Sequence, residues 1–162
     1  MLNEAAELLE TLKASGKTLA SGESLTAGLF GARICEVPGA SAVYLGGVIS
    51  YHPSVKEKLL NVKESTINRY SVVSSEVAAE MAIGCQRATG ADIAISCTGN
   101  AGPSVEPGGK PVGCVFLGLA YGGNVWTVPL QLSGDRNEIR EKTVLAMIRF
   151  IASLFPKTEV RG

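Results

Sequence analysis

The sequence is poor in the residues that build metal sites. It contains one histidine, His52, and no Cys-x-x-Cys pair. Zinc sites usually combine closely spaced cysteines and histidines, so this pattern argues against a metal centre. The four cysteines are far apart and stand in apolar surroundings, which predicts reduced, buried thiols in a reducing compartment. These cysteines are Cys35, Cys85, Cys97 and Cys114.

The sequence also lacks net charge and long apolar runs. Fifteen basic residues balance fifteen acidic ones, and no basic run is interleaved with aromatic residues. Nucleic acid is therefore not an expected partner. No apolar run approaches the roughly 20 residues that span a bilayer, and residues 1–12 have the pattern of an amphipathic helix rather than a signal peptide. We expect a soluble, cytoplasmic protein that does not bind membranes.

The apolar periodicity predicts an α/β fold. A chain of 162 residues suits a single domain, here residues 1–162, without internal repeats or linkers. Helical patterns alternate with strand patterns, and two late strands form a hairpin through Gly122-Gly123, which together predict a three-layer α/β/α sandwich with a mixed β-sheet. Helices are expected near residues 1–15, 25–35, 53–60, 63–69, 74–89 and 136–154, and strands near 18–20, 44–51, 91–97, 112–121 and 124–132.

Three predicted strands end in polar or glycine-rich segments. These segments are Glu23-Ser24, Ser50-Tyr51 and Thr98-Gly99. If the three ends share one edge of the sheet, they form a single pocket. Ser24 stands where a strand turns into a helix, a place that suits a nucleophile. From the local sequence alone, however, capping of the following helix by Ser24 or Thr26 is the more common outcome.

A base for Ser24 is not obvious, because a Ser-His-Asp triad would need His52. Lys56 is the best-placed alternative, since burial or the positive end of a helix can favour a neutral lysine. From spacing alone, a solvated lysine on the helix surface is the more common outcome. In that interpretation Val55, Leu59 and Leu60 form the apolar side of the helix, and Lys56 lies outside it.

Six short motifs occur in order along the chain. They are Glu23-Ser24-x-Thr26-x-Gly28, residues 37–41 (VPGAS), residues 46–51 (GGVISY) with Lys56, Thr98-Gly99-x-Ala101-Gly102-Pro103, residues 110–113 (KPVG) and Gly134-Asp135-Arg136. Together they resemble the C-terminal domain of the competence-damage-inducible protein CinA, which also occurs alone as nicotinamide-nucleotide amidase. The resemblance runs from about Leu8 to Ile151.

The resemblance implies an enzyme that hydrolyses nicotinamide mononucleotide to nicotinate mononucleotide and ammonia without a cofactor or metal. It makes Ser24 the nucleophile, Lys56 the general base and Tyr51 the group that relays or orients the proton. It assigns the substrate's phosphate and ribose to Thr98 and Gly99 with Arg136 or Arg140. Further substrate-binding residues are expected at Glu23, Thr26, Gly46, Gly47 and Ser50, and family analogy predicts a homo-oligomer, most simply a dimer.

Three places depart from the family pattern: Ala27, Asn100, and Ser104-Val105, which interrupts a run that is normally glycine-rich. Ala27 stands where a second glycine is usual, and we expect it to fit the first turn of a helix. Asn100 replaces an aliphatic residue, and asparagine tolerates a left-handed backbone. Two other functions therefore remain open: a catalytically weak paralogue that acts as a nucleotide-binding or partner module, and a Ser-Lys amidase for another small amide.

The last predicted helix has two interpretations at its start. Gly134-Asp135-Arg136 can offer backbone N–H groups and a guanidinium to a phosphate. The local sequence equally predicts that Asp135 caps the helix and that the arginines pair with Glu138 and Glu141.

Overall fold

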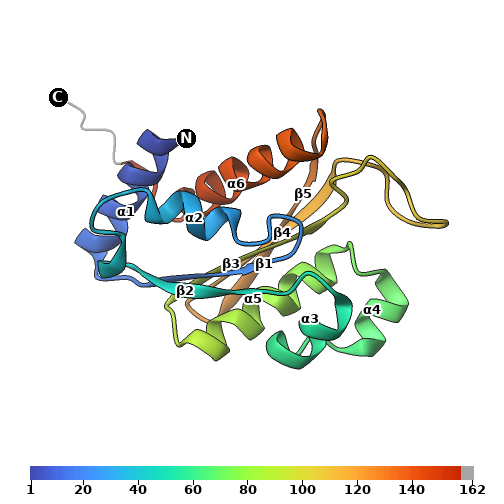
Figure 1. Ribbon diagram of the computed structural model, residues 1–162. Helices are drawn as coiled ribbons and strands as arrows, with labels where there is room; N and C mark the ends of the chain where they lie inside the picture. The colour runs from blue at the N-terminus through green and yellow to red at the C-terminus, as the bar shows by residue number, and fades with distance from the viewer. Residues whose placement is uncertain (158–162) are drawn as a thin grey trace.

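The computed structural model describes residues 1–157 and contains one five-stranded mixed sheet. The strand order is β2-β1-β3-β4-β5; β1 pairs in parallel with β2 and β3, whereas β3, β4 and β5 are successively antiparallel. Helices α1, α2 and α6 cover one face, and α3, α4 and α5 cover the other (Figure 1). The predicted three-layer sandwich is confirmed.

The elements follow the predicted order closely. The strands are β1 Leu19–Glu23, β2 Tyr44–Ile49, β3 Ile93–Gly99, β4 Cys114–Tyr121 and β5 Asn124–Gln131. The helices are α1 Leu2–Ser15, α2 Leu29–Cys35, α3 Pro53–Leu60, α4 Glu64–Tyr70, α5 Ser75–Thr89 and α6 Arg136–Ala152, with a 3₁₀ turn at Ala40–Ala42.

The central strands bring the three polar strand ends together. Every residue of β1, and every residue of β3 before Gly99, is buried, as the near-continuous apolar run at residues 91–97 predicts for a strand covered on both faces. In the parallel pairing, Glu23 lies opposite Ile49 on one side and opposite Cys97 on the other. Ser24, Ser50 and Thr98 therefore lie at the same edge of the sheet.

The predicted apolar side of α3 is right for Leu60, which is buried, but wrong for Leu59 and Lys56. Lys56 is only 1% exposed, whereas Leu59 is 51% exposed. Lys56 and Leu60 are four residues apart and share the inward face. The helix can lie this close to α5 because Gly84 has no side chain: a Cβ at Gly84 would overlap the carbonyl of Leu60.

The start of α2 also differs from expectation. The helix begins at Leu29 with Gly28 as its N-cap, and neither Ser24 nor Thr26 caps it. Ala27 lies before the helix with φ of 48°, so its expected place in a helical first turn is wrong. Asn100 does not adopt a left-handed backbone, because its N–H continues the strand pairing to the carbonyl of Cys114.

The cysteines are all free, but they are not all buried. Cys85 and Cys97 lie in the core, Cys114 is half-buried, and Cys35 is exposed. Cys35 is the last residue of the short helix α2, where the chain returns to the surface. The prediction of buried thiols therefore holds only for the two cysteines in the core.

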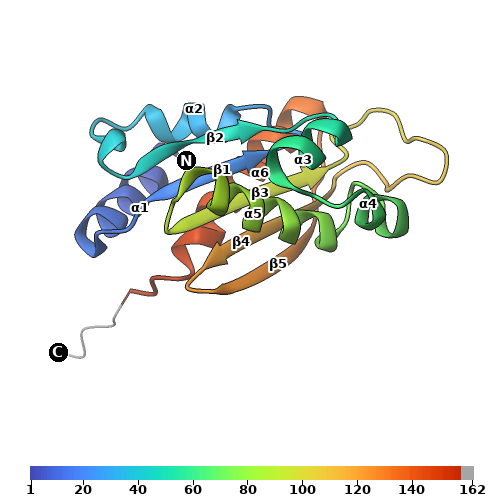
Figure 2. The ribbon, with the colours of Figure 1, turned by 90° about the horizontal axis from the view of Figure 1, so that it is seen from below.

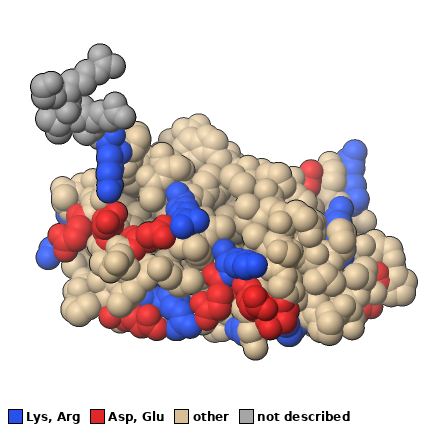
Figure 3. Space-filling model, turned by 90° about the horizontal axis from the view of Figure 1, so that it is seen from above, with Lys and Arg blue, Asp and Glu red and all other residues tan. Residues whose placement is uncertain are grey.

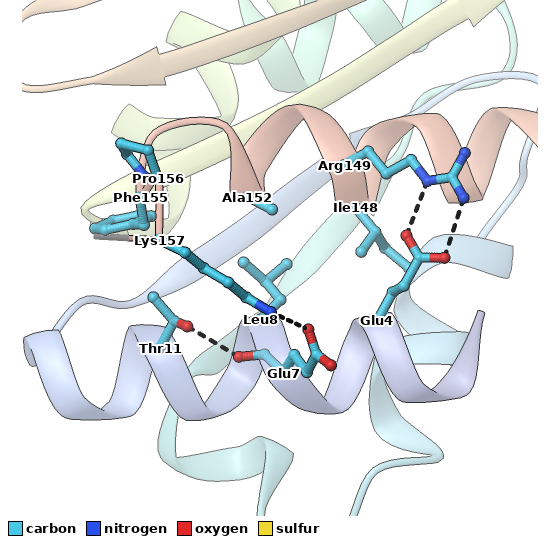
Figure 4. A pocket seen from close by; sticks show the side chains of 10 residues that line it. All are labelled: Glu4, Glu7, Leu8, Thr11, Ile148, Arg149, Ala152, Phe155, Pro156 and Lys157. Atoms are coloured by element: carbon cyan, nitrogen blue, oxygen red, sulfur yellow. Dashed lines mark hydrogen bonds and ion pairs between the residues drawn. The ribbon is translucent and has the colours of Figure 1, made fainter. Parts of the chain in front are cut away.

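The outer face formed by α1, α2 and α6 carries acidic and basic side chains side by side (Figure 3). Arg33 pairs with Glu36 and Glu141, and Arg149 pairs with Glu4. A cavity of about 200 Å³ lies between α1 and α6. Two ion pairs cross it, Glu4 with Arg149 and Glu7 with Lys157 (Figure 4). Exposed pairs of this kind contribute little to stability, because water and salt screen them. Within residues 1–157, no helix is both long enough and apolar enough to cross a bilayer.

Candidate active site

Ser24 and Lys56 form a buried pair at the carboxyl edge of the parallel strands. Ser24 directly follows β1, and Lys56 lies in the first turns of α3. The Nζ of Lys56 is 2.7 Å from the Oγ of Ser24, and the two residues are 1% and 6% exposed. This distance lies within the reach that proton transfer between a nucleophile and its base requires.

Two backbone carbonyls hold the amino group of Lys56 in place. Its Nζ donates to the carbonyl of Ser50 at 2.6 Å and to that of Tyr51 at 3.0 Å. Burial lowers the pKa of Lys56 to about 8, from an ordinary value of 10.5. None of the ion pairs among residues 1–157 involves Lys56. A neutral amine in this position keeps two N–H donors for the carbonyls and turns its lone pair to Ser24.

Glu23 anchors the turn that carries Ser24. One carboxylate oxygen accepts from Thr26 Oγ1 at 2.6 Å and from the N–H of Phe30 at 2.9 Å; the other accepts from Ser21 Oγ and from the N–H of Gly31, each at 3.2 Å. The glutamate thereby satisfies first-turn N–H groups of α2. Glu23 and Thr26, both expected to bind substrate, are buried and bonded to each other. Their side chains shape the turn.

Arg140 holds the same turn from the side of α6. Its Nε donates to the carbonyl of Leu25 at 2.9 Å, and its Nη2 donates to that of Thr26 at 3.0 Å. The guanidinium is therefore engaged with the backbone directly after Ser24. This arrangement makes Arg140 a positioning residue and leaves Arg136 as the arginine of the predicted pair that is placed to meet a ligand.

Tyr51 connects Lys56 with Arg136. Its carbonyl accepts from Lys56, whereas its hydroxyl accepts from Arg136 Nη2 at 3.0 Å. Arg136 Nη1 also donates to the carbonyl of Gly102. Within residues 1–157 the phenol makes no hydrogen bond to Ser24 or Lys56, so the contact through which Tyr51 orients the lysine is its backbone carbonyl.

The end of β3 adjoins Ser24. The N–H of Ser24 donates to the carbonyl of Cys97 at 3.2 Å, and Thr98 follows directly. The side chain of Thr98 is buried and donates to the carbonyl of Val72, which ties β3 to the segment before α5. Gly99 and Arg136 line a cavity of about 560 Å³ that extends from this edge.

Four residues take other positions or roles than the sequence indicates. Gly46 and Gly47 lie midway along the edge strand β2, where they pair with Ala20 and Ser21 of β1. Ser21 is about 10 Å along the strand from Ser24. A Cβ at Gly47 would lie 2.6 Å from Ser21 Oγ, so packing explains this glycine. Ser50 contributes its carbonyl, and its buried hydroxyl faces the carbonyl of Glu23. His52 caps α3 at the surface.

Asn100 is a residue whose role the sequence does not reveal. Its Nδ2 donates to the carbonyls of Ser104 and Lys110, at 3.1 and 3.0 Å, and its Oδ1 accepts from the N–H of Gly102 at 2.9 Å. These bonds brace the loop between β3 and β4. The signal that could have found it is an asparagine two residues before a turn glycine, the pattern of an Asx-turn.

At the start of α6, Asp135 caps the helix, as one of the two interpretations of its sequence predicts. Asp135 and Glu138 form a capping box, and Glu141 pairs with Arg33 rather than with an arginine of α6. Capping therefore does not prevent Arg136 from reaching across to Tyr51 and Gly102.

Comparison with known proteins matches this chain to CinA and CinA-like proteins. The family model described as the CinA C-terminal domain matches residues 2–155. A CinA-like protein of Kosmotoga olearia is 40% identical over 144 residues, covering 89% of this chain and 35% of its own length, and one of Thermotoga neapolitana is 42% identical over 138 residues, covering 85% and 34%.

Solved structures agree with these relatives. A competence-damaged protein (CinA) superfamily protein of Escherichia coli superposes with a TM-score of 0.92 at 29% identity, covering 94% of this chain and 89% of the other. The chain spans about a third of the length of the two CinA-like relatives. By sequence and structure together, the chain belongs to the CinA C-terminal domain family.

Proposed function

We propose that this domain is a serine amidase that uses Lys56 as its base and hydrolyses the carboxamide of nicotinamide mononucleotide. The observation that carries the proposal is the 2.7 Å contact between Lys56 Nζ and Ser24 Oγ in a buried setting. A lysine is normally protonated and solvated. Here burial lowers the pKa of Lys56 to about 8, which brings the neutral form that can accept a proton within reach near physiological pH.

The first half of the reaction forms an acyl-enzyme. Lys56 takes the proton of Ser24 as Oγ attacks the carboxamide carbon, which gives a tetrahedral oxyanion. The N–H of Leu25, the residue after the nucleophile, is a suitable oxyanion donor in a turn held by Glu23 and Arg140. When the C–N bond breaks, the ammonium of Lys56 returns a proton to the leaving amine, and ammonia departs.

The second half returns the enzyme to its starting state. Water attacks the ester on Ser24 while Lys56, neutral again, accepts a proton from that water. The second tetrahedral intermediate expels Ser24 Oγ, which recovers its proton from Lys56, and nicotinate mononucleotide is released. The carbonyls of Ser50 and Tyr51 hold the lysine amino group throughout.

The decisive experiment measures ammonia release from nicotinamide mononucleotide, with nicotinamide and the riboside in parallel. The wild type is expected to release ammonia from the mononucleotide, and Ser24→Ala is expected to fold normally without turnover. A Ser24→Ala rate above about a tenth of wild type, a loss below ~1.4 kcal/mol of transition-state stabilisation, would rule out Ser24 and make Ser50 the next candidate.

The same assay separates the other functions. Ammonia from the riboside or nicotinamide in preference to the mononucleotide would indicate an amidase for another small amide. Binding of the mononucleotide without ammonia release would indicate a nucleotide-binding module.

A further inference from the structure

The turn between β1 and α2 contains two buried backbone N–H groups that have no protein partner. The N–H of Ser24 donates to the carbonyl of Cys97, and that of Ala27 donates to the carbonyl of Ser24. Among residues 1–157, the N–H groups of Leu25 and Thr26 donate to no protein acceptor. Leu25 is 4% exposed and Thr26 is fully buried. Since buried N–H groups are almost always paired, this pair beside the nucleophile indicates that a ligand supplies the acceptor.

The two N–H groups point to the same side of the turn. The bond from Ala27 to Ser24 closes a four-residue turn, and its two central residues, Leu25 and Thr26, have negative φ. Successive N–H groups in such a turn lie nearly parallel, as they do in the first turn of a helix. Leu25 directly follows Ser24, and the N–H in that position is a common oxyanion donor in serine hydrolases. The N–H of Thr26 is placed to act beside it.

Arg140 holds the opposite end of the peptide unit that carries the Thr26 N–H. Its Nε donates to the carbonyl of Leu25 at 2.9 Å. In a trans peptide this carbonyl and the N–H of Thr26 point in opposite directions. The N–H therefore points away from α6, whose first turns lie beside the loop between β1 and α2 (Figure 2). A charged donor on the carbonyl polarises the peptide unit, so its N–H becomes a stronger donor.

The positive charge of Arg140 is not neutralised by a carboxylate. Its Nη2 donates to the carbonyl of Thr26 at 3.0 Å, and its Nη1 donates to the side-chain oxygen of Asn137 at 3.1 Å. No ion pair among residues 1–157 includes Arg140. Three neutral oxygens thus fix the guanidinium and leave its charge to act on the turn. A fixed charge of this kind stabilises negative charge that develops during a reaction.

We propose that the N–H groups of Leu25 and Thr26 together bind the oxyanion, and that Arg140 is a positioning residue whose charge strengthens the Thr26 donor through the Leu25-Thr26 peptide. The inference rests on the proposed function, because the oxyanion arises only when Ser24 Oγ adds to the carboxamide carbon. Arg140 acts through the turn and does not touch the substrate. Its effect is confined to states that carry the negative charge, so it should change the chemical step and leave substrate binding unaltered.

The test measures the affinity of the site for a tetrahedral anion. Pyridine-3-boronic acid adds to a serine hydroxyl to form such an anion, so its binding reports the oxyanion site without turnover. It is titrated calorimetrically into the wild type, Arg140→Gln, Arg140→Lys and, as the control, Arg87→Gln at an exposed arginine of α5. Removal of one oxyanion donor costs about 10²–10³ in rate, so Arg140→Gln, which weakens a donor without removing it, should bind the boronic acid about tenfold less tightly. Arg140→Lys keeps the charge and should lose less, and Arg87→Gln should match the wild type.

A second titration separates this effect from a distorted turn. Nicotinamide mononucleotide is titrated into Ser24→Ala, which cannot form the covalent adduct, and into the double variant that also carries Arg140→Gln. We expect equal affinities, because the bound substrate carries no oxyanion. Circular dichroism and the melting temperature confirm that each variant folds.

Three results would overturn the inference: no binding of the boronic acid by the wild type, equal binding by the wild type and a folded Arg140→Gln, or weaker binding of the mononucleotide by the double variant. Ammonia release tests the proposed function separately. Boronic acid binding that depends on Arg140, without ammonia release from the mononucleotide, would reject only the amidase activity on this substrate. Ammonia release with unchanged boronic acid binding in Arg140→Gln would reject only the role of Arg140.

Discussion

Lys56 Nζ and Ser24 Oγ lie 2.7 Å apart, although 32 residues separate the two in the chain. Ser24 is placed by a buried strand and Lys56 by a helix packed on the opposite face from α2 (Figure 1). The contact forms in a protein interior where both residues are almost inaccessible to solvent. A lysine so placed acquires properties that can be measured directly.

The first prediction concerns the pH dependence of activity. The base must be neutral, and burial sets the pKa of Lys56 at about 8. We expect kcat/KM to rise about tenfold per pH unit below pH 8 and to level off above it. Initial rates of ammonia release between pH 6 and 9.5 measure this profile. A flat profile over that range would argue against Lys56 as the base.

The second prediction concerns the pH dependence of stability. Lys56 has a pKa of about 8 when folded and an ordinary value of 10.5 when unfolded, so between these values only the unfolded chain holds the proton. The contribution of Lys56 to the free energy of unfolding therefore rises with pH between about 8 and 10.5, by about 3 kcal/mol in total. Below pH 8 both states are protonated, and this contribution is constant and unfavourable to folding.

A difference measurement isolates this effect. Burial raises the pKa of Tyr44 to about 12, of Cys85 to about 12 and of Cys97 to about 11, so these groups lower stability as pH rises. Urea denaturation of the wild type and Lys56→Met at pH 7.5 and 10 cancels their common contribution. Relative to that of Lys56→Met, the free energy of unfolding of the wild type should be higher at pH 10 than at pH 7.5. If this difference in the free energy of unfolding is the same at both pH values, Lys56 keeps an ordinary pKa.

The third prediction separates the two arginines of α6. Arg140 contacts backbone carbonyls beside the nucleophile, so Arg140→Ala should lower kcat several-fold and leave the preference for the mononucleotide over the riboside unchanged. Arg136→Ala should instead raise KM for the mononucleotide, because a charge-assisted contact of ~1.5–3 kcal/mol is lost. Steady-state kinetics on both substrates measure the difference. The control is Arg87→Ala, at an exposed arginine of α5, which should leave kcat and KM unchanged. If Arg136→Ala and Arg140→Ala had the same effect, the separate roles of the two arginines would be contradicted.

The fourth prediction concerns backbone strain at Ala27. Its φ of 48° is a left-handed conformation that costs an L-residue roughly 1–2 kcal/mol. Ala27→Gly removes this cost but adds flexibility to the unfolded chain, worth about 0.4–1 kcal/mol. We expect a net gain of up to about 1 kcal/mol in the free energy of unfolding, measured by urea denaturation.

A matched substitution in a helix gives the opposite sign. Ala14 is exposed in α1, and Ala14→Gly should destabilise the protein by about 0.5–1 kcal/mol. If both substitutions were destabilising by the same amount, Ala27 would carry no strain.

Local sequence patterns determined the order of helices and strands in this protein. The continuous apolar run before Thr98 predicted the buried strand β3, and the polar residues after three strands predicted a shared edge. Such patterns are informative because burial on one or two faces imposes a fixed spacing on apolar residues. The same sequence motifs identified the family.

Only the tertiary structure decided which side of α3 is buried and which groups meet at the edge. Local sequence places Leu59 inside and Lys56 outside, but the approach of α3 to Gly84 of α5 reverses them. The roles of Glu23, Arg140 and Asn100 likewise depend on partners in other turns, helices or strands. Contacts between segments distant in the chain leave no local periodicity, so their energies select an arrangement that the sequence pattern alone does not specify.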